Sequence, residues 1–166
     1  STRSSVGSVR SVYESGDSYD IVVTTQDWHI DPGDHFSSNP DFVDSWPPHG
    51  VAGTDEAEIH PAVAEIPVDA HVKKGQYAAA YSGFEGTTKG GSSLETILRD
   101  HRIEAVDVVG LALSHCVKDT ALDAQHLGFT TTCLTDLSEP VSLESGEAAV
   151  AAMEDAGVTV TTSSQL

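Results

Sequence analysis

The sequence predicts an α/β fold in which a parallel β-sheet is covered by helices on both faces. Segments typical of buried strands alternate along the chain with segments whose apolar residues recur at helical spacing, and such alternation is typical of parallel sheets. The 166 residues suit a single core, and no internal repeat or Gly- or Pro-rich linker divides them. We therefore expect one three-layer domain over residues 1–166.

Five segments have strand character, because each is a short run rich in apolar and β-branched residues. They are residues 21–25, 68–72, 106–113, 130–135 and 158–162. Three further segments carry apolar or alanine residues at helical spacing, namely 94–101, 117–127 and 143–153. Gly128 and Gly157 follow the last two, where helices commonly end.

The chain is strongly acidic: eight Lys plus Arg against 26 Asp plus Glu give a formal charge of −18. This charge argues against nucleic acid or an anionic membrane surface as a partner, because both would be repelled. A solvated acidic surface and adaptation to high salt both remain open as explanations. No apolar run approaches the roughly 20 residues of a membrane-spanning helix. The serine-rich start lacks the apolar segment of a secretory signal, so we expect a cytoplasmic protein.

Two long loops do not fit a bare scaffold, because long connections in compact domains are usually functional or disordered. Residues 26–66 hold two Trp, two Phe and four His, too many aromatic side chains for a disordered linker. Residues 73–93 form a Gly- and Ser-rich loop between a strand and a helix. Both loops leave the sheet at the carboxyl ends of strands, where open parallel sheets bind ligands.

The first loop contains a candidate metal site. Asp27 and His29 follow directly on a strand and point to the same side, and His35 and His49 can return to them through turn-rich segments. One carboxylate and three imidazoles suit one divalent metal such as Zn, Fe or Mn. The alternative is that these histidines are merely exposed or cap turns.

Cys116 is a candidate nucleophile, because it stands where a buried strand gives way to a helix. A helix N-terminus lowers the pKa of a thiol, and its free N–H groups can hold an oxyanion. The alternative is a buried structural cysteine, which is the interpretation we favour for Cys133 in its strand-like run. Lys74, at the end of another strand, could lower the thiol pKa by its charge or could simply be solvated.

Several motifs together resemble the nicotinamidase/pyrazinamidase family of isochorismatase-like cysteine hydrolases. They occur in order at plausible spacings, and the similarity runs from about residue 5 to the C-terminus. The motifs are residues 27–36, Trp46-Pro47-Pro48-His49, Lys74-Gly75, residues 81–86 and residues 110–117.

The resemblance implies a role for each matching residue. The metal ligands would be Asp27, His29, His35 and His49; the nucleophile Cys116; the catalytic lysine Lys74; and the substrate-binding residues Trp46, Tyr81 and His115. The bond between Leu111 and Ala112 matches a non-proline cis peptide of the family. The N–H groups of Ala112 and Cys116 would then form the oxyanion hole.

The resemblance also implies the reaction: hydrolysis of nicotinamide, and of pyrazinamide as well, to the acid and ammonia, which belongs to NAD salvage and pyridine nucleotide biosynthesis. Cys116 would form a thioester, and water held by the metal would cleave it. The only partner implied is the small-molecule substrate. The chain could be a monomer or a homo-oligomer.

Two features depart from the family pattern. Ser114 stands where the family usually has Asp before His-Cys. The family also opens with an apolar strand that ends in the general-base Asp, and nothing here matches it; residues 1–15 instead resemble the family's first helix. We therefore expect an N-terminally truncated chain, inactive by itself, whose sheet lacks its first, central strand between residues 21–25 and 106–113.

Two other functions remain as alternatives. A related amidohydrolase acting on another small amide, such as a carbamoyl compound, would share the cysteine and lysine but generally lacks the four-ligand metal set. A non-catalytic relative that binds a metal or ligand could have lost its base. The histidines distinguish the first alternative, and the missing carboxylate bears on the second.

Overall fold

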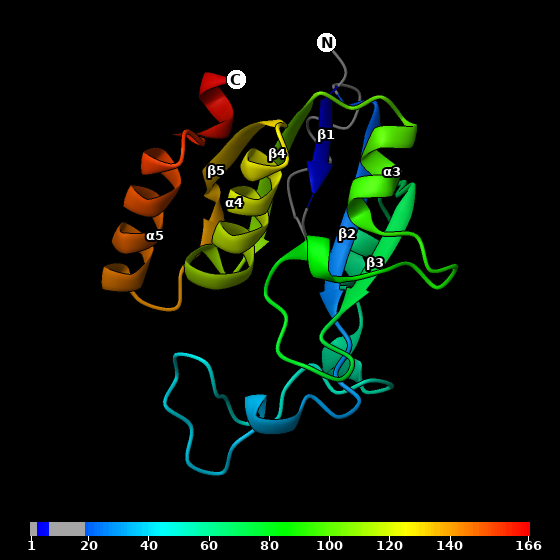
Figure 1. Cartoon of the computed structure of the whole chain (residues 1–166), viewed down its shortest axis with the longest axis vertical. Helices are drawn as coiled ribbons and strands as arrows, with labels where there is room; N and C mark the ends of the chain where they lie inside the picture. Colours follow the sequence, from blue (N-terminus) through cyan, green and yellow to red (C-terminus); the bar gives the residue numbers. More distant parts are fainter. Residues whose placement is uncertain (1–2, 7–18) are drawn as a thin grey trace.

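The computed structural model describes residues 3–6 and 19–166, and these form a parallel sheet flanked by helices (Figure 1). The strands run in the order β3-β2-β1-β4-β5-β6. Their bounds are β1 Arg3–Val6, β2 Ile21–Asp27, β3 Ala70–Lys74, β4 Ala105–Leu111, β5 Thr130–Glu139 and β6 Thr159–Thr161. The five predicted strands are thus confirmed, with β5 extending further than expected.

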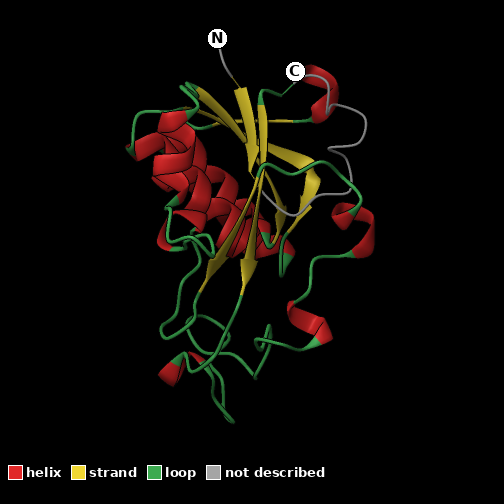
Figure 2. Ribbon diagram, turned by 90° about the vertical axis from the view of Figure 1, so that its right-hand side faces the viewer, coloured by secondary structure: helices red, strands yellow, loops and turns green. Residues whose placement is uncertain are grey.

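The three predicted helices are confirmed as α3 (Leu94–Asp100), α4 (Lys118–His126) and α5 (Leu143–Asp155). They lie together on one side of the sheet, and the short helix α2 (Pro61–Ala64) lies on the other (Figure 2). Ser93 and Ser142 cap α3 and α5 by accepting backbone N–H groups of the first turn. No helix among the described residues is long and apolar enough to cross a membrane.

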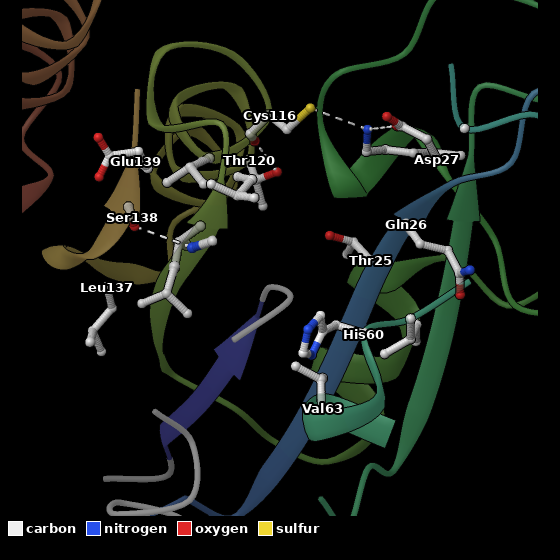
Figure 3. A pocket seen from close by; sticks show the side chains of 18 of the residues that line it. Thr25, Gln26, Asp27, His60, Val63, Cys116, Thr120, Leu137, Ser138 and Glu139 are labelled. Atoms are coloured by element: carbon white, nitrogen blue, oxygen red, sulfur yellow. Dashed lines mark hydrogen bonds and ion pairs between the residues drawn. The ribbon is translucent and has the colours of Figure 1, made fainter. Parts of the chain in front are cut away.

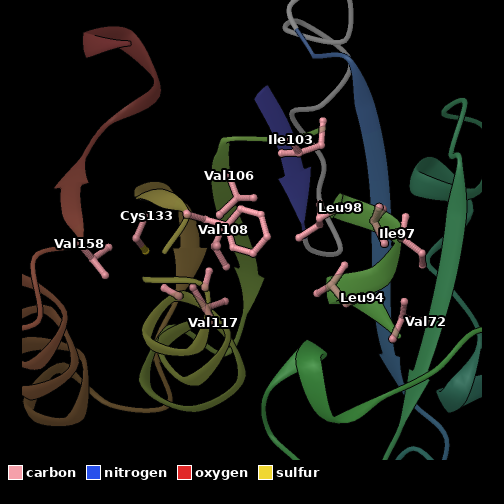
Figure 4. Packing of buried hydrophobic residues seen from close by; sticks show 14 of the residues in the cluster. Val72, Leu94, Ile97, Leu98, Ile103, Val106, Val108, Val117, Cys133 and Val158 are labelled. Atoms are coloured by element: carbon pink, nitrogen blue, oxygen red, sulfur yellow. The ribbon is translucent and has the colours of Figure 1, made fainter. Parts of the chain in front are cut away.

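Side chains alternate between the two faces of the sheet, as the strand period requires. Ile21 and Val23 of β2 belong to the larger core cluster beneath the long helices, whereas Val22 belongs to a smaller cluster on the other face. Figure 4 shows the larger cluster, in which Leu94 and Leu98 of α3 are fully buried. The apolar runs seen in the sequence therefore form the two layers of core.

The expectation that the central position of the sheet is empty is wrong. Strand β1 lies between β2 and β4, and its residue Val6 pairs with Val23 on one side and Val108 on the other. The facing edges of β2 and β4 need backbone partners, and this pairing overrides the weak strand character of Arg-Ser-Ser-Val. Residues 3–6 are therefore not part of a first helix; the rest of the proposed helix, residues 7–15, lies outside the described residues.

The connection from β4 to α4 is longer than expected, because the strand ends two residues before Leu113 and α4 begins one residue after Val117. Strand β4 ends at Leu111, and Leu113–Val117 form a single π-helical turn, η5, before α4 begins at Lys118. Cys116 lies inside this turn. Such turns often occur at functional sites.

Candidate active site

A buried lysine lies at the centre of the site, at the end of β3. The Lys74 side chain is 3% exposed, and its ammonium donates hydrogen bonds to Asp27 Oδ1, to the Ala80 carbonyl at 3.0 Å and to Cys116 Sγ at 3.4 Å. Asp27 is the last residue of β2, and Cys116 faces it from the turn that follows β4 (Figure 3). The alternative of a solvated lysine is therefore excluded.

Burial and charge oppose each other in this contact. Burial raises the pKa of the Cys116 thiol, and the Lys74 ammonium offsets only part of the effect, so the lowering that we expected at a helix start is not found. Burial also lowers the pKa of Lys74, but the negative charges of Cys116 and Asp27 outweigh it and leave that pKa above its ordinary value. The lysine thus stays charged, and its charge is what favours a thiolate.

The backbone before Cys116 provides a hydrogen-bond donor. The peptide bond between Leu111 and Ala112 is cis, as the resemblance implied. The Ala112 backbone hydrogen-bonds the Cys116 side chain and lowers its pKa slightly against burial. Cys133, in contrast, is fully buried within β5, where burial raises its pKa to about 12. Of the two cysteines, Cys116 lies against a charged side chain, whereas Cys133 lies in the apolar core.

Three of the four predicted metal ligands converge. His29, His35 and His49 each offer one ligand atom, and these atoms lie within 4.8 Å of one another. Asp27 lies at the edge of this group, because its Oδ1 contacts Lys74 while its Oδ2 lies 3.9 Å from His29 Nε2. The structure thus supports a three-histidine group with a carboxylate beside it.

The three imidazoles share one hydrogen-bonding pattern. Each places Nδ1 against a backbone carbonyl: His29 on Gly75 at 2.6 Å, His35 on Asp44 at 3.0 Å and His49 on Pro47 at 2.8 Å. A carbonyl only accepts, so Nδ1 carries a proton in each ring, and the neutral form of each ring then presents the lone pair of Nε2.

The chemistry of this group fits a divalent metal. His29 Nε2 is buried and has no hydrogen-bond partner, which is costly for a polar atom unless something binds it. Burial lowers the pKa of His29, and the neighbouring imidazoles act in the same direction, so the ring is kept in the neutral form that binds metals. Neutral imidazoles held by carbonyls are the usual setting of a Zn, Fe or Mn site.

Two glycines make room for these ligands. Gly75 has a φ of 72°, and a Cβ there would lie 2.5 Å from His29 Cε1. A Cβ on Gly50 would lie 2.9 Å from the Cβ of Asp27. The sequence motifs give neither glycine a role of its own; the available signal is that each directly follows a predicted site residue, Lys74 or His49.

The predicted substrate-binding residues line one small pocket of about 230 Å³, together with Cys116, His35 and His49. The His115 ring lies 5.2 Å from the Trp46 ring and 5.6 Å from the Tyr81 ring, measured between centroids. Trp46 Nε1 donates to the Tyr81 hydroxyl at 3.1 Å. The pocket is below the usual size of drug-sized ligand sites, which suits a single small aromatic ring.

A larger cavity of about 1090 Å³ lies beyond the end of β1, between the carboxyl ends of β2 and β4. It shares Asp27, His49, Leu111 and Cys116 with the small pocket. The aromatic residues that we predicted to bind substrate border only the small pocket. The small pocket is therefore the one that brings the predicted ring-binding residues to Cys116, whereas Lys74 lines the larger cavity.

Ser114 changes the environment of His115. The buried Ser114 hydroxyl accepts the Val141 N–H at 3.1 Å and lies 2.9 Å from His115 Nδ1. The Val141 N–H uses one lone pair of the hydroxyl and leaves its hydrogen available to donate to Nδ1, which favours a neutral imidazole protonated at Nε2. Burial, followed by the charge of Lys118, lowers the pKa of His115.

This geometry, a cysteine, a buried lysine and three histidines at the carboxyl edge of a parallel sheet, is accompanied by clear similarity to known proteins. A model of the family described as Isochorismatase domain matches residues 9–165, and the chain belongs to this family. Within it, the chain is similar to nicotinamidases.

Two relatives show that similarity in sequence. The chain is 47% identical over 146 residues to the nicotinamidase/pyrazinamidase of Mycobacterium tuberculosis, covering 88% of this chain and 78% of that protein. It is 34% identical over 152 residues to the nicotinamidase of Escherichia coli, covering 81% of this chain and 70% of that protein.

Two solved structures show it in three dimensions. The L. infantum protein PnC1, in complex with nicotinate, matches with a TM-score of 0.82 and 27% identity, covering 98% of this chain and 93% of that chain. The pyrazinamidase of Pyrococcus horikoshii, in complex with zinc, matches with a TM-score of 0.79 and 26% identity, covering 98% and 99%.

We predict that Lys74→Met raises the pKa of the Cys116 thiol, because the positive charge that opposes burial is lost. Alkylation of Cys116 by iodoacetamide should then accelerate only at higher pH, and its rate at neutral pH should fall by roughly tenfold or more. Lys73→Met is the matched control, since Lys73 contacts the Trp28 ring instead of the thiol. An unchanged pH profile in the Lys74 variant would contradict the pairing.

We predict that Ser114→Asp raises the pKa of His115, because a carboxylate beside Nδ1 stabilises the imidazolium. The pKa is measured from the pH dependence of the imidazole proton shifts by NMR. In the wild-type chain the pKa of His115 in the folded state lies below its ordinary value of 6.5. As the pH falls from 6.5 to this folded pKa, the unfolded chain takes up a proton that the folded chain does not, and the fold loses stability. The Asp variant should lose part of this destabilisation. Ser114→Ala removes the donor to Nδ1 without adding a charge, so it should raise the pKa much less than Ser114→Asp does.

Proposed function

We propose that this chain hydrolyses nicotinamide to nicotinic acid and ammonia, and pyrazinamide to the corresponding acid, as a step of NAD salvage. The observation that carries the proposal is that one small aromatic pocket is bordered by both Cys116 and two histidines of the three-histidine group. The activities named for the Mycobacterium tuberculosis and Escherichia coli relatives support it, as does the nicotinate in the L. infantum structure.

The first half-reaction is acyl transfer to Cys116. The thiolate, stabilised by Lys74, attacks the carboxamide carbon, and the N–H groups of Ala112 and Cys116 stabilise the oxyanion. The C–N bond breaks, ammonia leaves with the proton that the thiol released, and a thioester remains. Water then cleaves the thioester, which releases the acid and restores the thiol.

His29, His35 and His49, with Asp27 beside them, would hold one divalent metal, Zn, Fe or Mn. When bound, such an ion supplies a Lewis acid that can orient a pyridine nitrogen and lower the pKa of a water molecule. Trp46, Tyr81 and His115 would enclose the ring and keep bulk water from it. Carbamoyl-compound amidohydrolases generally lack this ligand set, so the histidine group favours nicotinamide as substrate.

Proton transfer limits the rate in this proposal. Among the described residues, no carboxylate is hydrogen-bonded to Cys116; the nearest charged partner is Lys74, with Asp27 on its other side. Within the described part of the chain, a thiol whose pKa is raised by burial therefore has no base placed at sulfur. General-base catalysis contributes roughly 100- to 10,000-fold in rate, so turnover without such a base would be slower by about this factor.

We predict that Cys116→Ala abolishes the release of ammonia from nicotinamide and that Cys133→Ala leaves most of it. Because turnover is expected to be slow, ammonia is measured at high enzyme concentration over long incubation. Mass spectrometry of the acid-quenched wild-type chain should show the nicotinoyl adduct on Cys116. Ammonia release that survives Cys116→Ala, or release only from a different amide, would refute the proposal.

We predict that the purified chain binds one divalent metal ion and that His49→Ala reduces its metal content strongly, because one of three converging imidazoles is lost. Elemental analysis after removal of loosely bound ions gives the ratio of metal to protein. His126→Ala, which removes an exposed histidine at the end of α4, is the control. Stoichiometric metal unaffected by His49→Ala removes the assignment.

A further inference from the structure

The loop of residues 37–45 connects two residues of the site, His35 and Trp46. Its ends are joined by backbone hydrogen bonds, from Trp46 N–H to the His35 carbonyl at 2.8 Å and from Ser37 N–H to the Trp46 carbonyl at 2.9 Å. The loop therefore leaves the wall of the pocket and returns to it at nearly the same place. Its inner structure determines where these two site residues can lie.

One carboxylate oxygen organises this loop from within. Asp41 Oδ1 accepts the backbone N–H groups of Val43 at 2.9 Å, Asp44 at 3.0 Å and Ser45 at 2.9 Å, and the Ser45 hydroxyl at 2.9 Å. The Ser45 hydroxyl oxygen in turn accepts the Asp41 N–H at 2.9 Å. These donors hold the pKa of Asp41 well below its usual range. The carboxylate is therefore ionised in the folded protein at neutral pH.

The same peptide units direct two carbonyl groups toward the site. The Asp44 carbonyl accepts from His35 Nδ1 at 3.0 Å, and the Val43 carbonyl accepts from the Tyr81 hydroxyl at 3.1 Å. Their N–H groups point to Asp41 while their carbonyls contact a candidate metal ligand and a wall of the substrate pocket. A loss of the accepting Asp41 oxygen would release both carbonyls together.

We infer that Asp41 is a positioning residue of the active site, which fixes the orientation and tautomer of His35 and the place of Tyr81 through two adjacent carbonyl groups. The inference rests on the proposed function, since it takes His35 as a metal ligand and Tyr81 as a substrate contact. Asp41 is exposed and contributes nothing to the core, so its effect is confined to this loop. Partners that orient metal-binding histidines commonly change metal affinity when they are lost.

The test measures the affinity of the whole chain for Zn²⁺ by competition with a chromogenic chelator. Asp41→Ala should weaken Zn²⁺ binding by roughly tenfold or more, and should raise KM for nicotinamide through Tyr81. Asp41→Asn keeps the oxygen that accepts the N–H groups and should retain most of the affinity. Ser45→Ala, which removes one donor, should cause a smaller loss in the same direction.

Thr88→Ala is the matched control, because its hydroxyl accepts the Ser92 N–H in a loop that does not line the pocket. Wild-type affinity in Asp41→Ala, with a clear loss in His35→Ala, overturns the role of Asp41 and leaves the metal site standing. Wild-type affinity in both variants overturns the metal site and the positioning role with it. Equal losses in Asp41→Ala and Asp41→Asn also overturn the inference, because the accepting oxygen would then not matter.

Discussion

The buried ammonium of Lys74 is the constraint on which the site depends. A charge removed from water is tolerated only when it is paired and hydrogen-bonded, and Lys74 meets this condition with Asp27, the Ala80 carbonyl and Cys116. These partners come from the end of β2, from the loop after β3 and from the turn η5 after β4. Satisfying one charge therefore fixes the relative positions of the nucleophile and of the carboxylate that borders the histidine group.

The histidine group follows a different rule, because its rings are held by backbone carbonyls. Gly75 follows Lys74 directly, so the residue that accepts from His29 is fixed by the same strand end that buries the lysine. Pro47 and Asp44 belong to the long loop, and they orient His49 and His35. The two parts of the site are coupled through β3. Burial lowers the pKa of His29 and keeps that imidazole neutral, whereas the negative charges of Cys116 and Asp27 keep Lys74 charged in spite of its burial.

Much of this could be predicted from the sequence, for reasons that can be assigned. Strands such as Ile21–Asp27 and Ala105–Leu111 are apolar and β-branched, so their pattern alone identifies them. Strand β1 could not be found, because Arg-Ser-Ser-Val owes its conformation to pairing on both sides.

Side chains of the site were visible as motifs, but the carbonyls that orient them have no sequence signature. Asp41 was missed for that reason: its effect passes through the backbone of Val43 and Asp44. The raised thiol pKa of Cys116 was missed because burial is a property of the folded chain.

The site is also divided between two halves of the sheet. Asp27 and Lys74 end β2 and β3, whereas Cys116 follows β4, and within the sheet these halves are joined through the short strand β1. A second link lies above the sheet, where the Thr120 hydroxyl accepts the Gly83 N–H at 2.9 Å and donates to the Cys116 carbonyl at 2.6 Å. Gly83 begins the short turn after β3, so this hydroxyl connects the lysine side of the site directly to the turn that carries the nucleophile. The distance between the Lys74 ammonium and the Cys116 thiol is thus fixed by two links: the pairing of β1 with β2 and β4, and the buried Thr120 hydroxyl.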